Sequence, residues 1–239
     1  MDKTERYKIY QTKCSEYDLL VSREDYKNNI LKIIQEIKPL NNSIVIDSGC
    51  GSGRLTYIAE PYSKYIYAFD FIKEMLIKAK EKSSPRCESK IIFASADHRN
   101  LPVKTGVADL LICGWSVCHL IKWNWKTWKN ELKKTILEFQ RTINSSGKII
   151  IFETLGTGVK KPLPPGNELS EYYTELENEY CLKKDIIQTD YLFKDYAEFE
   201  FLTEFFFGKE ALKNIVIEKN FRMEKNKIIL PEFTGVWHL

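Results

Sequence analysis

A glycine-rich turn at positions 44–56 constrains the fold of this chain more than any other feature. The segment reads I-V-I-D-S-G-C-G-S-G-R-L-T, in which an apolar run ends at Asp47 and three glycines follow at a spacing of two: Gly49, Gly51 and Gly53. Glycine has no Cβ, so such a turn can adopt positive φ and let a ligand approach the backbone. A helix beginning at Arg54 adds unpaired N–H groups and the positive end of its dipole. The pattern predicts a buried strand, a ligand-binding turn and a helix.

Two common phosphate-binding patterns do not fit this turn. A dinucleotide-binding turn reads G-x-G-x-x-G, but the sixth position counted from Gly49 is Arg54. A phosphate-binding loop has a lysine directly after its last glycine, and none follows Gly53. A nicotinamide-dependent oxidoreductase is therefore disfavoured. The pattern that remains is [DE]-x-G-x-G-x-G, with a purely structural turn as the alternative.

Composition favours a soluble protein with a sizeable core and does not predict nucleic-acid binding. The 239 residues suit one domain with an insertion, and 44% of them are hydrophobic. The 36 basic and 33 acidic residues give a net charge of +3, too balanced to predict nucleic-acid binding. The longest uncharged stretch, Leu110 to Ile121, is shorter than the roughly 20 residues of a membrane span. The N-terminus has no apolar signal region, so we expect a cytoplasmic protein without a membrane span.

The cysteines and histidines are not spaced as metal ligands. The six cysteines include no C-x-x-C pair, and the three histidines are scattered. We expect no metal ion, and thiols that stay reduced.

Helix and strand patterns alternate through the first two thirds of the chain. Apolar residues recur at steps of three and four within 24–37, 73–82 and 128–143, which is typical of amphipathic helices. Five short apolar runs predict strands: Ile44–Ile46, Tyr65–Phe69, Ile91–Ala94, Ala108–Cys113 and Lys148–Phe152. Strands that are apolar throughout are buried on both faces, as in a parallel sheet covered by helices. This is an α/β protein with a doubly wound sheet.

A candidate ligand-binding residue lies at or just after the end of each strand. These residues are Asp47, Asp70, Asp97, Gly114 and Glu153. In open α/β sheets ligands bind beyond the carboxyl ends of the strands, so we expect the five to share one crevice.

Residues from about 30 to 152 resemble the core of class I S-adenosylmethionine-dependent methyltransferases, of the type 11 or ubiquinone/menaquinone methyltransferase-like branch. The matching pieces, in order, are V-I-D-S-G-C-G-S-G-R, Y-A-F-D-F-I-K-E-M-L-I-K-A-K, A-S-A-D-H-R-N-L-P-V, A-D-L-L-I-C-G-W-S-V-C-H-L and G-K-I-I-I-F-E. The resemblance implies a Rossmann-like, mostly parallel seven-stranded sheet with an antiparallel last strand. It implies S-adenosylmethionine as cofactor, S-adenosylhomocysteine as product, and methyl transfer to an O, N or C nucleophile of a small molecule by in-line displacement.

The resemblance also assigns cofactor contacts. Asp70 would accept both ribose hydroxyls, and a carboxylate forms strong bonds of this kind. Asp97 and the backbone N–H of His98 would bind adenine, with no role for the histidine side chain. The adenine ring would pack on Phe71, Ile72 and Met75. The methionyl part would lie against the turn and the end of the fourth strand, which hold Asp47, Gly49, Cys50, Gly51, Gly53, Arg54, Gly114 and Trp115.

The acceptor side is less defined in the sequence. His119 and Glu153 are candidate bases, although His119 can equally serve packing at a helix start. Tyr17, Tyr172 and Tyr173 are candidate substrate contacts, and Tyr10 and Tyr17 are placed to close over the cofactor. Aromatic residues at helical spacing also suit a core, so both interpretations stand.

The single domain divides by pattern into four parts. These are a helical N-terminal cap (1–40), the cofactor-binding core (41–153), a small helical lid or insertion (154–208), and a closing helix and strands (209–239). A monomer or a homodimer fits the sequence. A non-catalytic S-adenosylmethionine-binding subunit, and an RNA or protein methyltransferase, remain the alternative functions.

Overall fold

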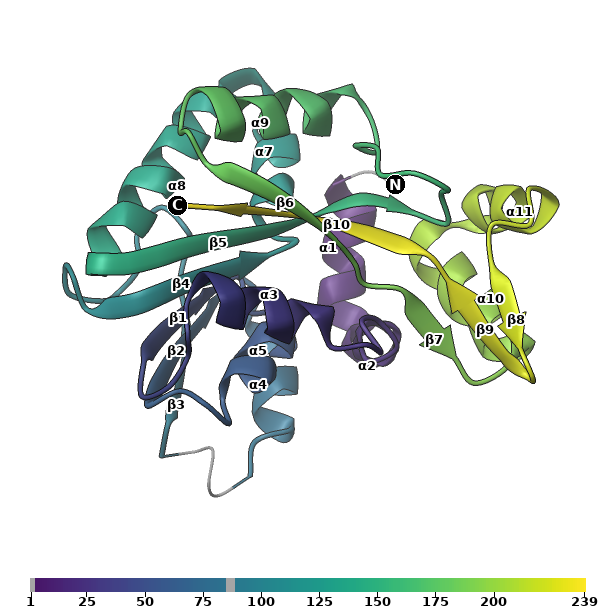
Figure 1. Ribbon diagram of the computed structural model, residues 1–239, viewed down its shortest axis with the longest axis horizontal. Helices are drawn as coiled ribbons and strands as arrows, with labels where there is room; N and C mark the ends of the chain where they lie inside the picture. The colour runs from purple at the N-terminus through teal and green to yellow at the C-terminus, as the bar shows by residue number, and fades with distance from the viewer. Residues whose placement is uncertain (1–2, 85–88) are drawn as a thin grey trace.

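The computed structural model describes residues 3–84 and 89–239, with side chains from residue 7 onward, so Cys87 lies outside the described residues. A seven-stranded sheet with the order β3-β2-β1-β4-β5-β10-β6 forms the centre of the molecule (Figure 1). Its strands are β1 (Ile44–Ser48), β2 (Tyr65–Asp70), β3 (Ile91–Ser95), β4 (Ala108–Gly114), β5 (Ile143–Thr157), β6 (Lys183–Gln188) and β10 (Glu232–His238). The strand β10 runs antiparallel to both of its neighbours. The predicted sheet, with one antiparallel last strand, is confirmed.

Helices cover both faces of this sheet, as Figure 1 shows. One face carries α3 (Asn29–Ile37), α4 (Arg54–Ala59) and α5 (Lys73–Glu81), and the other carries α7 (Val117–Trp123), α8 (Trp128–Thr142) and α9 (Asn167–Asn178). Alternate strand residues serve the two cores, because successive side chains of a strand point to opposite faces. In β4, Leu110 and Ile112 pack with α3, α4 and α5, whereas Leu111 and Cys113 pack with α7, α8 and α9.

A second, smaller sheet lies beside the core, on the right of Figure 1. It has the order β7-β9-β8 and comprises β7 (Tyr191–Phe193), β8 (Arg222–Glu224) and β9 (Lys227–Leu230), packed with α10 (Tyr196–Phe207) and α11 (Lys209–Ile217). The sequence predicted the helices here but not this sheet. Residues 183–193 are divided between the two sheets as β6 and β7, and 222–230 folds back as a hairpin with Lys225 at φ 58°. Neither break carries glycine, the usual signal of such a turn.

Two N-terminal helices, α1 (Lys3–Thr12) and α2 (Cys14–Val21), lie against α5 beside the carboxyl ends of the strands. Tyr10 of α1 packs with Ile72 and Met75 in one buried cluster. The N-terminal segment thereby forms part of the wall above the glycine turn. No helix in the described ranges is long and apolar enough to cross a membrane.

Candidate active site

The glycine turn between β1 and α4 has the backbone that the sequence predicts. Gly49, Gly51 and Gly53 have φ values of 77°, 54° and 87°. The backbone N–H groups of Gly49 and Cys50 both donate to the Phe69 carbonyl, at 2.7 and 2.8 Å. A Cβ on Gly49 would lie 2.1 Å from the Ser116 hydroxyl oxygen. Glycine at position 49 is therefore required both by φ and by the close approach of the residue after β4.

Asp70, at the end of β2, is bound to this turn. Its Oδ2 accepts the Gly51 N–H at 2.7 Å and its Oδ1 accepts the Ile72 N–H at 2.7 Å. Burial raises the pKa of the carboxyl to about 6, against the lowering effect of these N–H donors. Each oxygen keeps a further lone pair, and Asp70 lines the large cavity described next. The carboxylate can accept two hydroxyl groups there.

A cavity of about 500 Å³ opens beside the carboxyl ends of the strands. Its strand-end wall includes Gly49, Gly51, Asp70, Met75, Asp97 and Gly114. Its helical wall includes Tyr7, Tyr10, Tyr17, His119, Trp123 and Asn124. Phe71, Ile72, His98 and Trp115 also line it, so most of the predicted cofactor contacts meet in one space.

A second cavity of about 40 Å³ adjoins the glycine turn and shares Gly49, Gly51 and Gly114 with the large cavity. Its lining also includes Asp47, Cys50, Ser52 and Arg54. Three buried polar atoms here have no hydrogen-bond partner: Asp47 Oδ1, Ser52 Oγ and Arg54 Nη2. Such atoms are costly unless a water or ligand group pairs with them. One acceptor and two donors suit the ammonium and carboxylate of an amino acid, so the turn fits the methionyl end of S-adenosylmethionine.

Arg54 is held firmly where it faces this small cavity. Its Nη1 donates to Glu24 Oε2 at 2.7 Å, and its guanidinium lies 4.1 Å from the centre of the Trp115 ring. The side chains of Arg54 and Glu24 are 13% and 4% exposed. Burial strengthens this ion pair because solvent screens the two charges little. The Trp115 ring adds a cation–π contact to the guanidinium.

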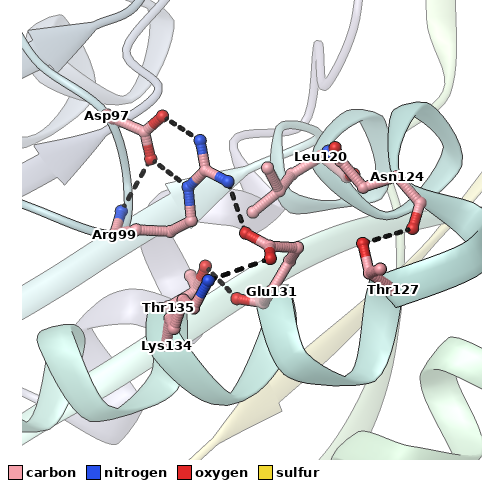
Figure 2. Close-up of polar contacts among 8 residues, drawn as sticks. All are labelled: Asp97, Arg99, Leu120, Asn124, Thr127, Glu131, Lys134 and Thr135. Carbon is pink, nitrogen blue, oxygen red and sulfur yellow. Dashed lines mark hydrogen bonds and ion pairs between the residues drawn. The ribbon is translucent and has the colours of Figure 1, made fainter.

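Asp97 is paired with Arg99, a residue that the sequence reasoning missed. Figure 2 shows the guanidinium of Arg99 between the carboxylates of Asp97 and Glu131. The Nε and Nη2 atoms donate to the two Asp97 oxygens at 2.8 and 2.6 Å, and Lys134 donates to Glu131 at 3.1 Å. The guanidinium lowers the pKa of Asp97, so this carboxylate stays charged at the cavity wall. The only sequence signal for this pair was that Arg99 follows Asp97 by two residues.

The side chain of His98, for which the sequence analysis predicted no role, connects three strand ends. Its Nδ1 lies 2.7 Å from Ser48 Oγ and its Nε2 lies 2.9 Å from Ser116 Oγ. Burial lowers the pKa of the imidazole to about 4, so it is neutral and donates one of these bonds while accepting the other. The ring thereby joins the last residue of β1 and the segment after β4 to the loop after β3.

His119 lies on the helical wall, within α7. Its Nε2 is 3.0 Å from the Tyr10 hydroxyl, and its ring stacks on Trp123 with a centroid distance of 5.5 Å. Tyr10 also meets Tyr17 edge-on, and Tyr17 contacts Phe206 of α10. Tyr17, a candidate substrate contact, lines the cavity. Aromatic side chains of α1, α2, α7 and α10 pack together beside it.

Three other predicted residues lie away from the cavity. Glu153 is fully buried in β5, where Oε1 accepts the Cys118 N–H of α7 at 2.9 Å and lies 3.4 Å from the Tyr172 hydroxyl. Tyr173 donates to the Thr154 carbonyl at 2.9 Å and packs on Trp237. None of the three lines the cavity. Glu153 binds the first turn of α7, and the two tyrosines belong to the core between α9 and the sheet.

Comparison with known proteins identifies the core that carries this site. A family model described as a methyltransferase domain matches residues 46–151, which span β1 to β5. Residues 46–151 of this chain are a methyltransferase domain, which supports the resemblance to class I S-adenosylmethionine-dependent methyltransferases. The fold agrees, because a structure of a SAM-dependent methyltransferase from Aquifex aeolicus superposes with a TM-score of 0.55, covering 100% of this chain and 98% of the other at 14% identity.

Two curated relatives share sequence with the methyltransferase core. The chain is 29% identical over 132 residues to a malonyl-[acyl-carrier protein] O-methyltransferase of Hamiltonella defensa, which covers 55% of this chain and 45% of the relative. It is 27% identical over 158 residues to the protein of that name from Buchnera aphidicola. That alignment covers 66% of this chain and 57% of the relative. The chain thus spans about half the length of these relatives.

Proposed function

We propose that this methyltransferase transfers the methyl group of S-adenosylmethionine to an O, N or C nucleophile of a small molecule. One observation carries the proposal: the glycine turn, Asp70 and Asp97 face the same cavity as an aromatic wall that holds His119. A cavity of about 500 Å³ is within the range of small-molecule sites.

The strand-end wall would hold the nucleoside part of the cofactor. Asp70 would accept the two ribose hydroxyls while keeping its bonds to Gly51 and Ile72. Asp97, charged beside Arg99, would accept a hydrogen bond from the adenine amino group. The backbone N–H of His98 would donate to a ring nitrogen of adenine. Phe71 and Met75 would pack on the ring, since Phe71 is 61% exposed beside the cavity and Met75 forms part of its wall.

The methionyl part would lie against the turn and the residues after β4. Asp47 and Arg54 each present an unpaired polar atom for its ammonium and carboxylate. Gly49, Cys50, Gly51, Gly53, Gly114 and Trp115 would line its path, with the glycines removing the Cβ atoms that would block it.

Bound S-adenosylmethionine supplies a methyl group already activated on a sulfonium. The protein then has to align the acceptor and exclude water, which are the main sources of rate in an in-line displacement. The rings of Tyr10, Tyr17 and Trp123 close the cavity opposite the strand ends. Of the two candidate bases, His119 has the favourable position, because it lines the cavity and Glu153 does not.

We place the reaction in the cytoplasm, where buried thiols such as those of Cys50, Cys113 and Cys118 stay reduced. Small molecules are the acceptors in this proposal, with a monomer or homodimer as the working unit. The names of the two relatives favour one specific alternative, a carboxylate carried on an acyl carrier protein.

Titration with S-adenosylhomocysteine in a calorimeter tests the cofactor site, and a radiolabelled-methyl assay on a metabolite extract tests transfer. Binding together with label in the small-molecule fraction is the expected result. Absence of binding would contradict the proposal. Binding without any transfer would favour a non-catalytic subunit, and label in RNA or protein would identify a macromolecular acceptor.

A further inference from the structure

Two buried glutamates are bonded to the same short segment, the one that links β6 to β7. Glu24, in the turn after α2, forms an antiparallel bridge with Tyr191. Glu232, the first residue of β10, accepts the Thr189 N–H on its carbonyl at 2.9 Å and donates its own N–H to Asp190 Oδ1 at 3.1 Å. The exposed fraction is 4% for the Glu24 side chain and 2% for Glu232. Both carboxyls are therefore held out of solvent at the junction between the two sheets.

The guanidinium of Arg54 lies beside both carboxyls but is bonded to one of them. Arg54 Nη1 donates to Glu24 Oε2 at 2.7 Å, whereas Glu232 Oε1 accepts the Thr154 hydroxyl at 2.7 Å. The second oxygen of each carboxyl, Glu24 Oε1 and Glu232 Oε2, is buried without a hydrogen-bond partner. Since Glu24 already balances the charge of Arg54, a second carboxylate would be buried uncompensated, which is strongly unfavourable. One of the two carboxyls therefore holds a proton.

The other ionisable groups around Glu232, among the residues that the structure describes, are balanced or neutral. Asp190 Oδ2 lies 3.6 Å from Arg222 Nη2, and Oδ1 accepts the Glu232 N–H. Tyr173 of α9 and Tyr191 of β7 are neutral phenols, and burial raises the pKa of each. Burial, and after it repulsion from the neighbouring carboxylate, also raises the pKa of Glu232 well above its ordinary value. Glu232 is therefore the member of the pair that takes the proton.

We propose that Glu232 stays protonated at neutral pH and so leaves Arg54 Nη2 available to the cofactor carboxylate, which makes Glu232 a positioning residue for the cofactor site. The inference rests on the proposed function and adds regulation by pH to the same site. Arg54 Nη2, beside the small cavity, and Glu232 Oε2 are both unpaired. The charge of Arg54 reaches Glu232, because it opposes the rise in the pKa of that carboxyl. Once Glu232 loses its proton, its carboxylate and the cofactor carboxylate compete for one guanidinium.

Cofactor binding and proton binding at Glu232 are linked by this competition. A carboxylate bound at Arg54 Nη2 favours protonated Glu232, and loss of the proton weakens binding of that carboxylate by the same factor. Stability follows the same direction. The folded state holds the Glu232 proton more tightly than the unfolded state, so the stability from this group is present below the ordinary pKa of 4.5 and is lost as the pH rises through the raised pKa.

Glu232→Gln tests the inference, with Glu153→Gln as matched control. Glutamine has the shape of the protonated acid and does not ionise, and Glu153 is a second fully buried strand glutamate, one that lines neither cavity. Calorimetry measures the affinity for S-adenosylhomocysteine in each protein. From about pH 6.5 to about pH 9, the wild-type affinity should fall about fivefold more than that of the Glu232 variant, and the Glu153 variant should follow the wild type. The ligand 5′-methylthioadenosine, which has no amino-acid part, should show one pH dependence in all three proteins.

Equal pH dependence of S-adenosylhomocysteine affinity in the wild-type protein and Glu232→Gln overturns the inference. A fall for 5′-methylthioadenosine that depends on Glu232 also overturns it, because this ligand has no carboxylate to compete for Arg54. Failure of Glu232→Gln to fold at neutral pH does so too, because the wild-type side chain is already neutral there.

Absence of S-adenosylhomocysteine binding by the wild-type protein at either pH contradicts the proposed function instead. Thermal unfolding then tests the proton alone. Glu232→Gln should gain stability over the wild-type protein as the pH rises, and a difference that does not change with pH overturns the protonation of Glu232.

Discussion

The Oδ2 atom of Asp70 accepts the backbone N–H of Gly51 at 2.7 Å, which joins the end of β2 to the turn after β1. The residue expected to bind ribose therefore also fixes the turn expected to bind the methionyl part. One hydrogen bond thus holds the two parts of the expected site in a fixed relation, and such preorganisation lowers the entropy lost on binding. The buried carboxylate is the linking element, because its two oxygens each hold one backbone N–H and face the cavity.

Asp70→Asn should weaken S-adenosylhomocysteine binding by about 10- to 100-fold, the scale of a lost hydrogen bond to a charged group. The new amide places a donor toward the N–H of either Gly51 or Ile72, and it accepts fewer hydroxyl bonds. Calorimetry measures the dissociation constant. Asp185→Asn, at a side chain that is 52% exposed, is the control. Equal affinity in the Asp70 variant and the wild-type protein would remove Asp70 from the cofactor site.

Gly49→Ala should destabilise the protein more than Gly208→Ala. Both glycines have positive φ, 77° and 91°, so both substitutions carry backbone strain. A Cβ at position 49 also meets Ser116 Oγ at 2.1 Å, whereas nothing lies within 4 Å of one at position 208. We expect an additional loss of about 1–3 kcal/mol for Gly49→Ala, from urea unfolding. Adding Ser116→Gly should recover part of it, and equal losses at the two glycines would contradict the packing argument.

The fold of the core could be predicted because its signals are local. Each of the first five strands contains a short apolar run, and the glycine turn immediately follows the first of them. Strand ends then place Asp47, Asp70 and Asp97 along one edge of the sheet, as the structure has them. The small sheet was not predicted, because its strands are short and pair across a long separation in sequence, such as Tyr191 with Leu230.

The aromatic side chains could not be sorted from sequence into core and cavity. Tyr172 and Tyr17 both lie on helices at apolar spacing, yet Tyr172 is fully buried and Tyr17 lines the cavity. Tyr172 points from α9 into the core against the sheet. The difference depends on how the helices dock, which helical spacing does not encode. Arg99 was missed for the same reason, since its partner Glu131 is 32 residues away on α8.

Glu153→Gln should make the protein more stable at pH 8 and leave methyl transfer intact. Burial raises the pKa of Glu153 from 4.5 to about 7, so the folded state binds more protons than the unfolded state between these values. The stability from this group is therefore fully present below pH 4.5 and is lost as the pH rises through 7. Glutamine has the same shape and does not ionise.

The gain at pH 8 should be at most on the order of 3 kcal/mol relative to pH 4.5. Thermal unfolding at several pH values measures it as a difference from the wild-type protein, which cancels the other buried acids. Glu200→Gln, at an exposed position of α10, is the control. A gain that does not depend on pH would contradict this assignment, and a loss of methyl transfer would restore Glu153 as a catalytic candidate.

Arg54→Met and Glu24→Gln, made singly and together, should separate the structural role of Arg54 from its role in binding. Arg54→Met leaves the Glu24 carboxylate, 4% exposed, without its 2.7 Å partner. Breaking a buried pair from one side costs about 3–5 kcal/mol, so the double variant should regain most of the stability that this single variant loses.

Affinity should not follow stability in the double variant. Arg54 Nη2 is unpaired beside the glycine turn, where the cofactor carboxylate is expected. The double variant should bind S-adenosylhomocysteine about tenfold or more weakly, because a charge-assisted bond is lost. It should bind 5′-methylthioadenosine, which has no amino-acid part, as the wild-type protein does. An equal loss for the two ligands would mean that Arg54 acts through the shape of the turn, whereas no loss for either would leave it with the ion pair to Glu24 alone.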